Sequence, residues 1–470
     1  MAMTAEREPV ITFGTDGWRG IIGDTFTVKG VRVVAQAFSD WLARSRSQSR
    51  KVLVGYDGRF GGEMFAMAAG RVLTGNGLSC EVSSGPIPTP AVSWWILNRK
   101  YAGGLMITAS HNPPAYSGVK IKPSYGGSPD DAIIDPIVRN LWKRTPREGH
   151  DPARVEIMPG YRCAVGSYTD LKAIGRMKGR VVFDPMGGAQ AGQMALVLKG
   201  RGPRLIEMHG RIDPMFCGLA SPEPVRKNLL GLEAAVKRER AMLGIGTDGD
   251  GDRVAIVDER GDFLTPHKVL ALLVIYMVRY RGETGAMVKT VSGSFLLDRI
   301  ARKHGLPIFE TPVGFKYVCR LMREHDIMIG GEESGGIGFR GYLPERDGLL
   351  AGLLFLELLA KSGKSCGRLV ADLEREFGVS RYGRIDVHTG KAQSALAKLR
   401  ASPPGAVAGT KVAKVNASDG LKLILPDDSW LLFRASGTEP LLRIYAESDN
   451  EGRTQKLLQA GAKLAGVGQK

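Results

Sequence analysis

The chain has 470 residues, of which 43% are hydrophobic and 24% are charged, and its 65 Lys and Arg residues exceed 48 Asp and Glu residues to give a formal net charge of +17. This length is too great for one ordinary core and predicts three or four domains, and the composition is typical of a soluble globular protein. The excess positive charge indicates an anionic partner, which on charge alone is nucleic acid, acidic lipid or a phosphorylated metabolite.

Three features predict a cytoplasmic protein with no membrane segment. The longest uncharged apolar run, Val269 to Val278, is far shorter than the roughly 20 residues that a membrane-spanning helix needs. Met1 to Val10 contains charges and no apolar core, so a signal peptide is not expected. The five cysteines are scattered singly without a C-x-x-C pair, which argues for a reducing compartment and against a disulfide framework or a cysteine zinc site.

Three segments of similar build follow one another along the chain. Each is a short apolar strand that opens into a glycine-containing loop and then a helical pattern, with strand and helix at 52–54 and 64–73, 181–183 and 189–199, and 286–288 and 295–304. Alternation of this kind is the signature of α/β layers, and repetition at about a hundred residues indicates a weak internal repeat. A binding site is expected where such strands end.

The C-terminal part differs in kind. Strand patterns at 383–387, 421–425, 430–433 and 442–445 and helical patterns at 391–400 and 451–464 predict an α+β domain with a mostly antiparallel sheet. The fold class is therefore α/β, with three similar domains built on mixed sheets and a fourth α+β domain. We place these domains at residues 1–153, 154–259, 260–375 and 376–470.

The segment Thr108 to Pro113 presents one serine on a stiff turn. Ser110 follows the strand-like run 105–107, and Pro113 and Pro114 each fix one backbone angle and disfavour helix before them. A hydroxyl held in this way, with the imidazole of His111 beside it, suits a nucleophile or a phosphate carrier. An ordinary strand-to-loop turn is the alternative.

Asp248, Asp250 and Asp252 stand at alternate positions of a glycine-containing turn. Three carboxylates that converge leave further positions open for water or a phosphate oxygen, which suits Mg²⁺. An EF-hand is excluded because Arg253 stands where that loop needs glycine and an apolar strand pattern follows. A solvated acidic loop is the remaining alternative.

Two more loops contain polar groups suited to a phosphosugar. Gly331 to Gly336 offers Glu332 and Ser334 as partners for sugar hydroxyls. Arg434 to Pro440, followed by Arg443, combines guanidinium groups, hydroxyls and glycine, which is typical of a phosphate cradle. A plain surface turn is the alternative for each loop.

The four loops in this order resemble those of the α-D-phosphohexomutase superfamily, and the resemblance runs from Phe13 to the end of the chain. The segment Phe13 to Gly20 is similar to the N-terminal substrate segment of that family. The resemblance implies four domains around a central cleft. It also implies an isomerase that moves a phosphoryl group between the 1- and 6-positions of a hexose through a 1,6-bisphosphate.

The resemblance implies a role for each matching residue. Ser110 is the phosphorylated serine, and its phosphate with the three aspartates holds Mg²⁺. Lys120 is the general acid or base, with a pKa lowered by Arg19 and the metal. Glucose 1,6-bisphosphate is the expected activator. The further catalytic residues are Arg19, His111 and Arg253, and the substrate-binding residues are Lys289, Gly314, Lys316, Glu332, Ser334, Arg434, Ser436, Gly437, Thr438 and Arg443.

The preferred sugar is predicted from positions at which this chain differs from members of the family that it resembles. Gly336 stands where several bacterial relatives have histidine, and Glu333 replaces the glutamine common in phosphoglucosamine mutases. Residues 311–316 resemble a phosphoglucomutase loop, so glucose is preferred and mannose is accepted as a second substrate. Phosphoglucosamine mutase and a non-catalytic phosphosugar-binding protein are the alternatives. Only the charge favours a nucleic-acid binder, so the expected partner is a phosphorylated hexose, with the chain a monomer or homodimer.

Overall fold

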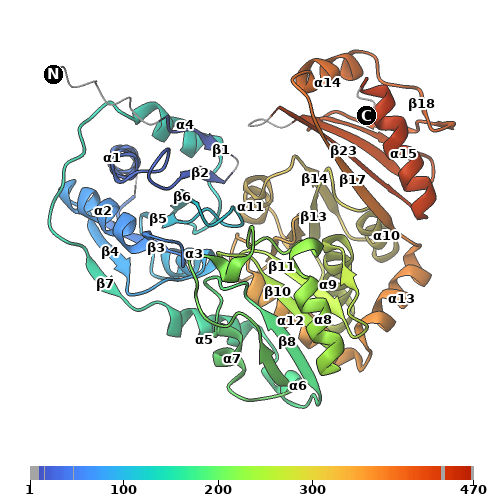
Figure 1. The fold of residues 1–470 in the computed structure, drawn as a ribbon, viewed down its shortest axis with the longest axis horizontal. Coiled ribbons are helices and arrows are strands. Elements are labelled where there is room, and N and C mark those ends of the chain that lie inside the picture. The colour runs from blue at the N-terminus through green and yellow to red at the C-terminus, as the bar shows by residue number, and fades with distance from the viewer. Residues whose placement is uncertain (1–9, 15, 46, 436–439, 467–470) are drawn as a thin grey trace.

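The computed structural model describes residues 10–14, 16–45, 47–435 and 440–466, and these form four large sheets that follow one another along an arc (Figure 1). The first three sheets mix parallel and antiparallel strands, whereas every pairing in the fourth is antiparallel. The predicted fold class is therefore confirmed. No helix in the described part of the chain is long and apolar enough to cross a membrane.

The first sheet positions residues 108–115, the loop that carries Ser110 and is called the serine loop below. Its strands, in spatial order, are β1 (Phe13–Gly14), β2 (Gly17–Ile21), β6 (Tyr116–Pro123), β5 (Gly103–Ile107), β3 (Lys51–Tyr56), β4 (Ser79–Ser83) and β7 (Ala153–Val155). The associated helices are α1 (Val28–Arg44), α2 (Gly62–Gly75), α3 (Thr89–Asn98) and α4 (Asp131–Asn140). Because β6 returns antiparallel to β5, the loop between them stands at the end of two fully paired central strands.

The second sheet positions the acidic turn. Its strands, in order, are β12 (Phe263–Leu264), β11 (Val254–Asp258), β10 (Leu243–Thr247), β8 (Arg180–Asp184) and β9 (Arg204–Glu207). Its helical segments are α5 (Met158–Tyr168), α6 (Leu171–Gly175), α7 (Gln193–Leu198), η1 (Phe216–Gly218), η2 (Arg226–Asn228) and α8 (Leu230–Glu239). The turn connects β10 to its antiparallel neighbour β11.

The third sheet positions the glycine-framed acidic loop. Its strands are β14 (Ile308–Thr311), β13 (Ala286–Thr290), β15 (Ile327–Gly331) and β16 (Ile337–Phe339), and the helices are α9 (Pro266–Tyr280), α10 (Phe295–His304), α11 (Phe315–Glu324), α12 (Gly348–Ser362) and α13 (Cys366–Phe377). The α12 helix begins where the Asp347 carboxylate accepts a hydrogen bond from Leu350 N, and it ends at Gly363, whose φ is 64°. It packs on β10 and β11, and so joins the second and third sheets.

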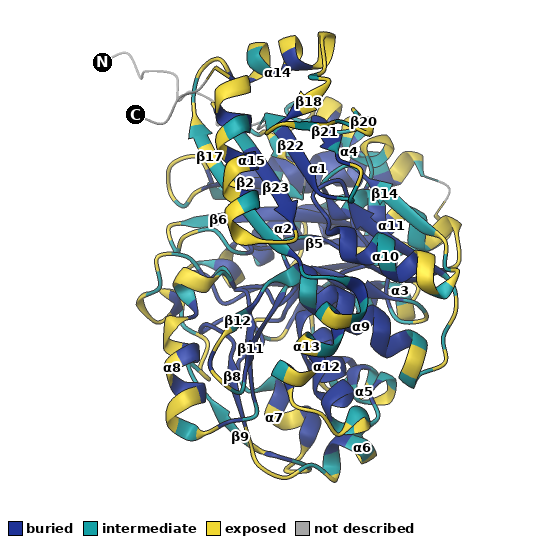
Figure 2. Ribbon diagram, turned by 90° about the vertical axis from the view of Figure 1, so that its right-hand side faces the viewer, coloured by how far each residue is buried: buried dark blue, intermediate teal, exposed yellow. Residues whose placement is uncertain are grey.

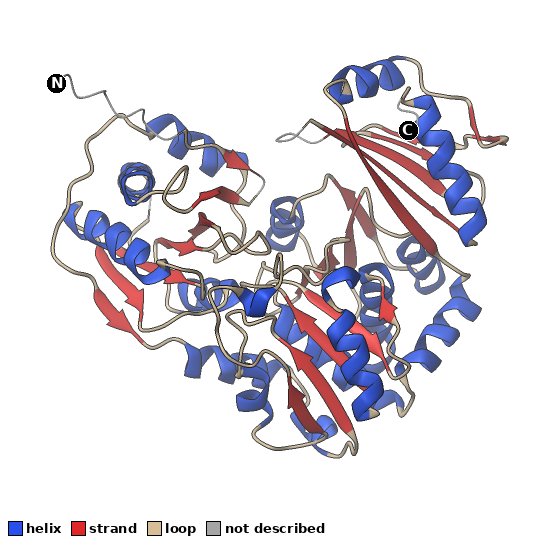
Figure 3. Cartoon of the chain, viewed as in Figure 1, coloured by secondary structure: helices blue, strands red, loops and turns tan. Residues whose placement is uncertain are grey.

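The fourth sheet is a twisted antiparallel layer with helices on one face (Figure 3). Its strands are β17 (Arg381–His388), β23 (Leu441–Ser448), β22 (Trp430–Ala435), β21 (Leu421–Ile424) and β20 (Lys414–Asn416), beside a small hairpin of β18 (Ala406–Val407) and β19 (Thr410–Lys411). Helices α14 (Ala392–Ala401) and α15 (Glu451–Leu464) cover one face. Trp430 and Tyr445 project from the other face into a core shared with the third sheet.

Buried residues make up most of the inner strands and helices of the molecule (Figure 2). One core runs from α3 of the first sheet through the second and third sheets to the inner face of the fourth. The α1 and α2 helices pack on the opposite face of the first sheet in a separate core. The strand ends that carry the predicted site residues are therefore anchored in a shared interior.

One predicted helix begins later than expected. The sequence pattern predicts helix over 189–199, but α7 spans only Gln193–Leu198. Gly187 and Gly192 adopt φ angles of 68° and 75°, so the preceding residues form turns and a helix cannot start before Gln193.

Candidate active site

Ser110 lies directly beyond β5 in a conformation that is unusual for a serine. Its φ is 52°, in the left-handed region that side-chain-bearing residues rarely adopt, and the residue is 1% exposed. Its Oγ donates to Asp248 Oδ2 at 3.0 Å and lies 3.4 Å from His111 Nδ1. Backbone strain of this kind is concentrated at functional sites, where surrounding contacts hold it in place. The predicted nucleophile is therefore held facing the turn that carries Asp248, Asp250 and Asp252, called the metal turn below.

The three aspartates converge as predicted. Asp248, Asp250 and Asp252 are fully buried, and one oxygen from each lies within 4.8 Å of the others. Within the described residues, Oδ1 of Asp250 and Oδ1 of Asp252 are buried without a hydrogen-bond partner. Orphaned carboxylate oxygens at this spacing fit a divalent cation, because burial without a partner is costly. Burial and the neighbouring carboxylates raise the pKa of Asp248 well above its ordinary value.

Two basic residues lie beside this turn. Arg253 N donates to Asp248 Oδ1 at 3.0 Å, and its guanidinium is 3.3 Å from Glu223. Burial lowers the pKa of His111 well below its ordinary value, with the positive charges of Arg253 and Arg19 acting in the same direction. His111 is therefore a neutral imidazole at pH 7.

Lys120 lies at the centre of the site on β6. Its Nζ is 2.9 Å from carboxylate oxygens of Asp16, Asp250 and Asp252, and the residue is 2% exposed. The lowering of the Lys120 pKa that the resemblance implies, by Arg19 and a bound metal, stays a prediction. Burial acts to lower the pKa, but the three carboxylates outweigh it and raise the pKa above its ordinary value. Arg19 instead contacts the serine loop, where it donates to Asn112 Oδ1 at 2.6 Å.

Arg346 is a functional candidate that sequence reasoning missed. Its guanidinium is 2.8 Å from Asp16, 2.9 Å from Asp252 and 3.4 Å from Glu332, so it joins the N-terminal segment, the metal turn and the predicted sugar loop. Its side chain is 5% exposed. A charged triplet, Glu-Arg-Asp at 345–347, directly before the long apolar run of α12 is the signal that could have identified it.

Residues 331–336, the predicted sugar loop, follow β15. Burial raises the pKa of Glu332 to about 7, and Ser334 Oγ is buried with no hydrogen-bond partner in the described residues. Glu333 accepts a hydrogen bond from Thr290 Oγ1 at 3.1 Å. A Cβ added at Gly336 would come within 2.2 Å of Arg346 Cδ. A side chain at this position, where several bacterial relatives have histidine, would therefore require Arg346 to shift.

Among the described residues, no contact joins Lys289, Gly314 or Lys316 to Ser110. Lys289 forms ion pairs with Asp298 and, at 3.4 Å, with Glu310. It lines a hollow of about 610 Å³ between the third and fourth sheets. Gly314, with a φ of 132°, precedes α11, and Lys316 Nζ lies 2.7 Å from Asp131 at the start of α4.

The predicted phosphate loop is described only at its flanks. Arg434 Nε donates to Asp419 Oδ2 at 2.9 Å, and the same oxygen accepts from Val313 N at 2.8 Å. Arg443 stands opposite Arg434 on the neighbouring strand. Ser436, Gly437 and Thr438 lie outside the described residues.

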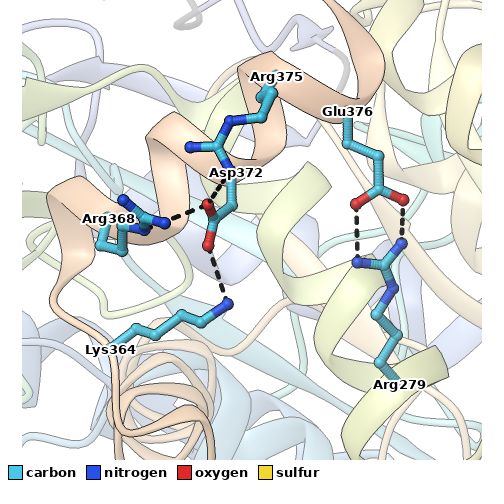
Figure 4. Close-up of a pocket in the computed structure, with 6 residues that line it drawn as sticks. All are labelled: Arg279, Lys364, Arg368, Asp372, Arg375 and Glu376. Carbon is cyan, nitrogen blue, oxygen red and sulfur yellow. Dashed lines mark hydrogen bonds and ion pairs between the residues drawn. The ribbon is translucent and has the colours of Figure 1, made fainter.

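A separate surface hollow of about 490 Å³ contains none of the predicted site residues (Figure 4). Asp372 on α13 accepts contacts from Lys364, Arg368 and Arg375 at 2.9 to 3.3 Å. Glu376 pairs with Arg279 from α9. These charges satisfy one another at the surface, and the hollow differs from the serine site in having exposed groups and no nucleophile.

Models of four protein domains match the chain in order. They are described as phosphoglucomutase/phosphomannomutase alpha/beta/alpha domain I, domain II, domain III and the C-terminal domain, and they match residues 10–148, 159–261, 265–377 and 385–464. The matches therefore cover most of the chain and include a separate model for each of the four sheets.

Three relatives match over nearly their whole length. A phosphoglucomutase/phosphomannomutase from Thermococcus kodakarensis is 33% identical over 460 residues, which cover 96% of this chain and 98% of the relative. A phosphoglucosamine mutase from Saccharopolyspora erythraea is 32% identical over 462 residues, with the same coverage. A crystal structure from Thermus thermophilus, provisionally described as a phosphomannomutase, aligns with a TM-score of 0.87 and 35% identity over 98% of this chain and 99% of that one.

Proposed function

The chain belongs to the phosphoglucomutase/phosphomannomutase family and is a phosphohexomutase, and we propose that Ser110 carries the phosphoryl group that it exchanges with its substrate. The observation that carries this proposal is the 3.0 Å contact between Ser110 Oγ and Asp248, at a buried triad of aspartates that also contacts Lys120. A hydroxyl placed at a cation site is suited to phosphoryl transfer, in which positioning and charge neutralisation dominate.

The transfer proceeds in two steps of opposite sense. The bond between phosphorus and Ser110 Oγ breaks as a bond to one sugar hydroxyl oxygen forms, which gives a hexose 1,6-bisphosphate. The bond between the other phosphorus and its sugar oxygen then breaks as a bond to Ser110 Oγ forms. In each step the protonated Lys120 Nζ gives a proton to the departing oxygen and takes one from the attacking hydroxyl, and Arg19 and Arg253 neutralise phosphate oxygens beside it. Asp248, Asp250, Asp252 and the phosphate on Ser110 would hold Mg²⁺, which would supply charge neutralisation for the transfer.

The remaining residues bind the part of the substrate that does not react. Ser334 Oγ, buried without a partner among the described residues, and Glu332 are available to the sugar hydroxyls. Arg434, Arg443 and the loop between them bind the phosphate at the far end, whichever end that is. We also propose Lys289, Gly314 and Lys316 as substrate-binding groups, although Lys289 pairs with Glu310 on the neighbouring strand and Lys316 pairs with Asp131 at the start of α4.

We propose glucose phosphate as the preferred substrate, with mannose phosphate also accepted. Thr290 holds Glu333 by a hydrogen bond, which leaves Ser334 and Glu332 as the hydroxyl-binding groups of the loop. Glucosamine phosphate is the second candidate. Two adjacent acids, Glu332 and Glu333, favour a protonated amine, and relatives of similar identity are named phosphoglucosamine mutases.

A coupled assay tests both parts of the proposal. The protein is incubated with Mg²⁺, a trace of glucose 1,6-bisphosphate as activator, and the 1-phosphate of glucose, mannose or glucosamine. We expect turnover of glucose 1-phosphate that Ser110→Ala lowers by several orders of magnitude. Ser167→Ala, at an exposed serine of α5, is the control and should leave turnover unchanged. Turnover of glucosamine 1-phosphate alone would overturn the sugar assignment. Full activity in Ser110→Ala would overturn the role of the serine.

A further inference from the structure

Arg59 holds the serine loop from behind. Arg59 belongs to the loop that follows β3, and its side chain is 0% exposed. Its guanidinium donates four hydrogen bonds to main-chain carbonyl oxygens of one short segment. The acceptors are Ser110 at 2.6 Å, Asn112 at 2.8 Å, and Pro113 and Tyr116 at 2.9 Å each. A planar fork with this many donors fixes several carbonyl groups relative to one another, which a lysine could not do.

Asp57 holds the other end of the same loop. Its carboxylate accepts from Arg59 Nε at 3.2 Å and from Thr108 Oγ1 at 2.5 Å. Thr108 Oγ1 in turn accepts from Ser110 N at 2.8 Å. Both main-chain polar groups of Ser110 are therefore fixed by one connected network, and the φ of 52° follows from that network rather than from the residue's own preference.

Arg59 also meets the second sheet. Its guanidinium lies 4.7 Å from the ring centre of Phe216, in η1. A Cβ added at Gly249, between the first two metal-turn aspartates, would lie 2.7 Å from Ser110 O and 3.2 Å from a ring carbon of Phe216. The carbonyl that Arg59 holds is thus packed directly against the metal turn, so a shift of Arg59 would change the distance between the serine and the three aspartates.

We propose that Arg59, with Asp57, is the positioning residue that sets Ser110 Oγ against the metal turn for phosphoryl transfer. Within the described residues it contacts no carboxylate of the metal turn and no predicted substrate-binding residue, so it acts through the serine loop alone. This inference rests on the proposed function of Ser110. It predicts an effect on the rate of transfer with little effect on substrate affinity.

The test is Arg59→Lys, which keeps the positive charge and loses the fork. We expect kcat to fall by about 100-fold, the usual cost of displacing a reacting group by about 1 Å, while KM for the hexose phosphate changes by less than about threefold. Backbone amide hydrogen exchange in residues 108–118 should accelerate, because four carbonyl groups of this segment lose their donor and the segment opens more often. A kcat within about threefold of the wild type in a folded variant would overturn the proposal.

Arg281→Lys is the matched control. Arg281 is also a largely buried arginine that pairs with a carboxylate, Glu357, donates to a main-chain carbonyl, Tyr168 O, and faces the ring of Tyr168 at 5.0 Å. It lies at the end of α9, and none of its contacts in the described chain is with the serine loop. We expect a loss of thermal stability in this variant with kcat and exchange of residues 108–118 unchanged. An equal fall of kcat in both variants would assign Arg59 a merely structural role.

Thr108→Val and hydrogen exchange test the same role independently of the kinetics of Arg59→Lys. If Arg59→Lys does not fold, Thr108→Val is the deciding variant, because valine is nearly isosteric with threonine and breaks only the link between Asp57 and Ser110 N. We expect kcat to be about 10-fold lower in Thr108→Val, and an unchanged kcat would overturn the proposal. If the wild type shows no mutase activity, the proposed function fails. The exchange of residues 108–118 then decides the positioning role independently, since unchanged exchange in Arg59→Lys would overturn it.

Discussion

The ion-pair cluster around Asp250 and the cluster around Asp372 have similar composition and opposite surroundings. In the first, Lys120 and Arg346 meet several carboxylates whose side chains are almost wholly excluded from solvent. In the second, on α13, three cations meet one carboxylate, and the side chain of Arg375 is 63% exposed (Figure 4). The same residue types therefore occur once in the interior and once at the surface.

The difference between the clusters shows which observation identifies a site. Opposite charges interact far more strongly when water is excluded, but burying them is costly unless every oxygen has a partner. The buried cluster retains orphaned oxygens on Asp250 and Asp252, beside a serine hydroxyl. The exposed cluster faces water, which satisfies its groups and screens their attraction. Unsatisfied buried charge, rather than density of charge, distinguishes the candidate active site.

The largest expected effect comes from removing one charge of the buried cluster. Asp250→Asn loses a predicted metal ligand and a partner of Lys120, so we expect mutase activity to fall by at least about 1,000-fold and the Mg²⁺ requirement to shift to higher concentration. The coupled assay at several Mg²⁺ concentrations measures both. Asp372→Asn, the surface counterpart, should keep activity within about twofold. Equal losses in the two variants would remove the functional distinction between the clusters.

The next effect concerns stability. Arg346→Met leaves Asp16, Asp252 and Glu332 without their shared cation, and breaking a buried ion pair in this way costs about 3–5 kcal/mol of unfolding free energy. Arg375→Met should cost less than about 1 kcal/mol, because its pair is exposed. Urea unfolding midpoints of both variants give the comparison. A small loss in Arg346→Met would show that water reaches the buried cluster.

The side chain of Arg434 is 15% exposed, between those of Arg346 in the buried cluster and Arg375 in the surface cluster, and it forms an ion pair with Asp419. Replacing its planar fork by a lysine should weaken a charge-assisted contact to the far phosphate, which is worth about 1.5–3 kcal/mol, so we expect KM for glucose 1-phosphate to rise by about 10-fold or more. The value of kcat should change less. Steady-state kinetics of Arg434→Lys separate the two constants, and an unchanged KM would place the phosphate elsewhere.

Much of the fold could be predicted from local patterns, and the reasons are physical. The β3, β8 and β13 strands are short apolar runs that end at turn residues, so the signal lies within a few positions. The α9 and α12 helices were not predicted, because nearly all of their faces are buried and the usual amphipathic period is missing. The proposed boundaries at 153, 259 and 375 stay predictions.

The candidate site was predicted only as far as its motifs extend. Ser110 and the three aspartates belong to recognisable loops, and the structure brings Ser110 to Asp248 although they are 138 positions apart. Arg346 and Arg59 belong to no such loop, because their importance comes from contacts across sheets that a single sequence does not reveal. The roles assigned to Lys289, Lys316 and the phosphate loop stay predictions.

The smallest expected effect tests the surface cluster by pH. Hydrogen bonds from Arg279 hold the pKa of Glu376 at about 2, with Lys303 also contributing. Because the pKa is about 4.3 in an unfolded chain, the folded form favours the carboxylate, so the stabilisation is full above about pH 4.3 and is lost as the pH falls toward about 2. Solvent screening limits this stabilisation to about 1 kcal/mol or less at pH 7.

Thermal midpoints of the wild type and Glu376→Gln should therefore differ slightly at pH 7, converge as the pH falls below about 4.3, and converge also in about 1 M salt. A difference that persisted in that salt would show that this pair is shielded from solvent, and the contrast with the buried cluster would then be one of degree.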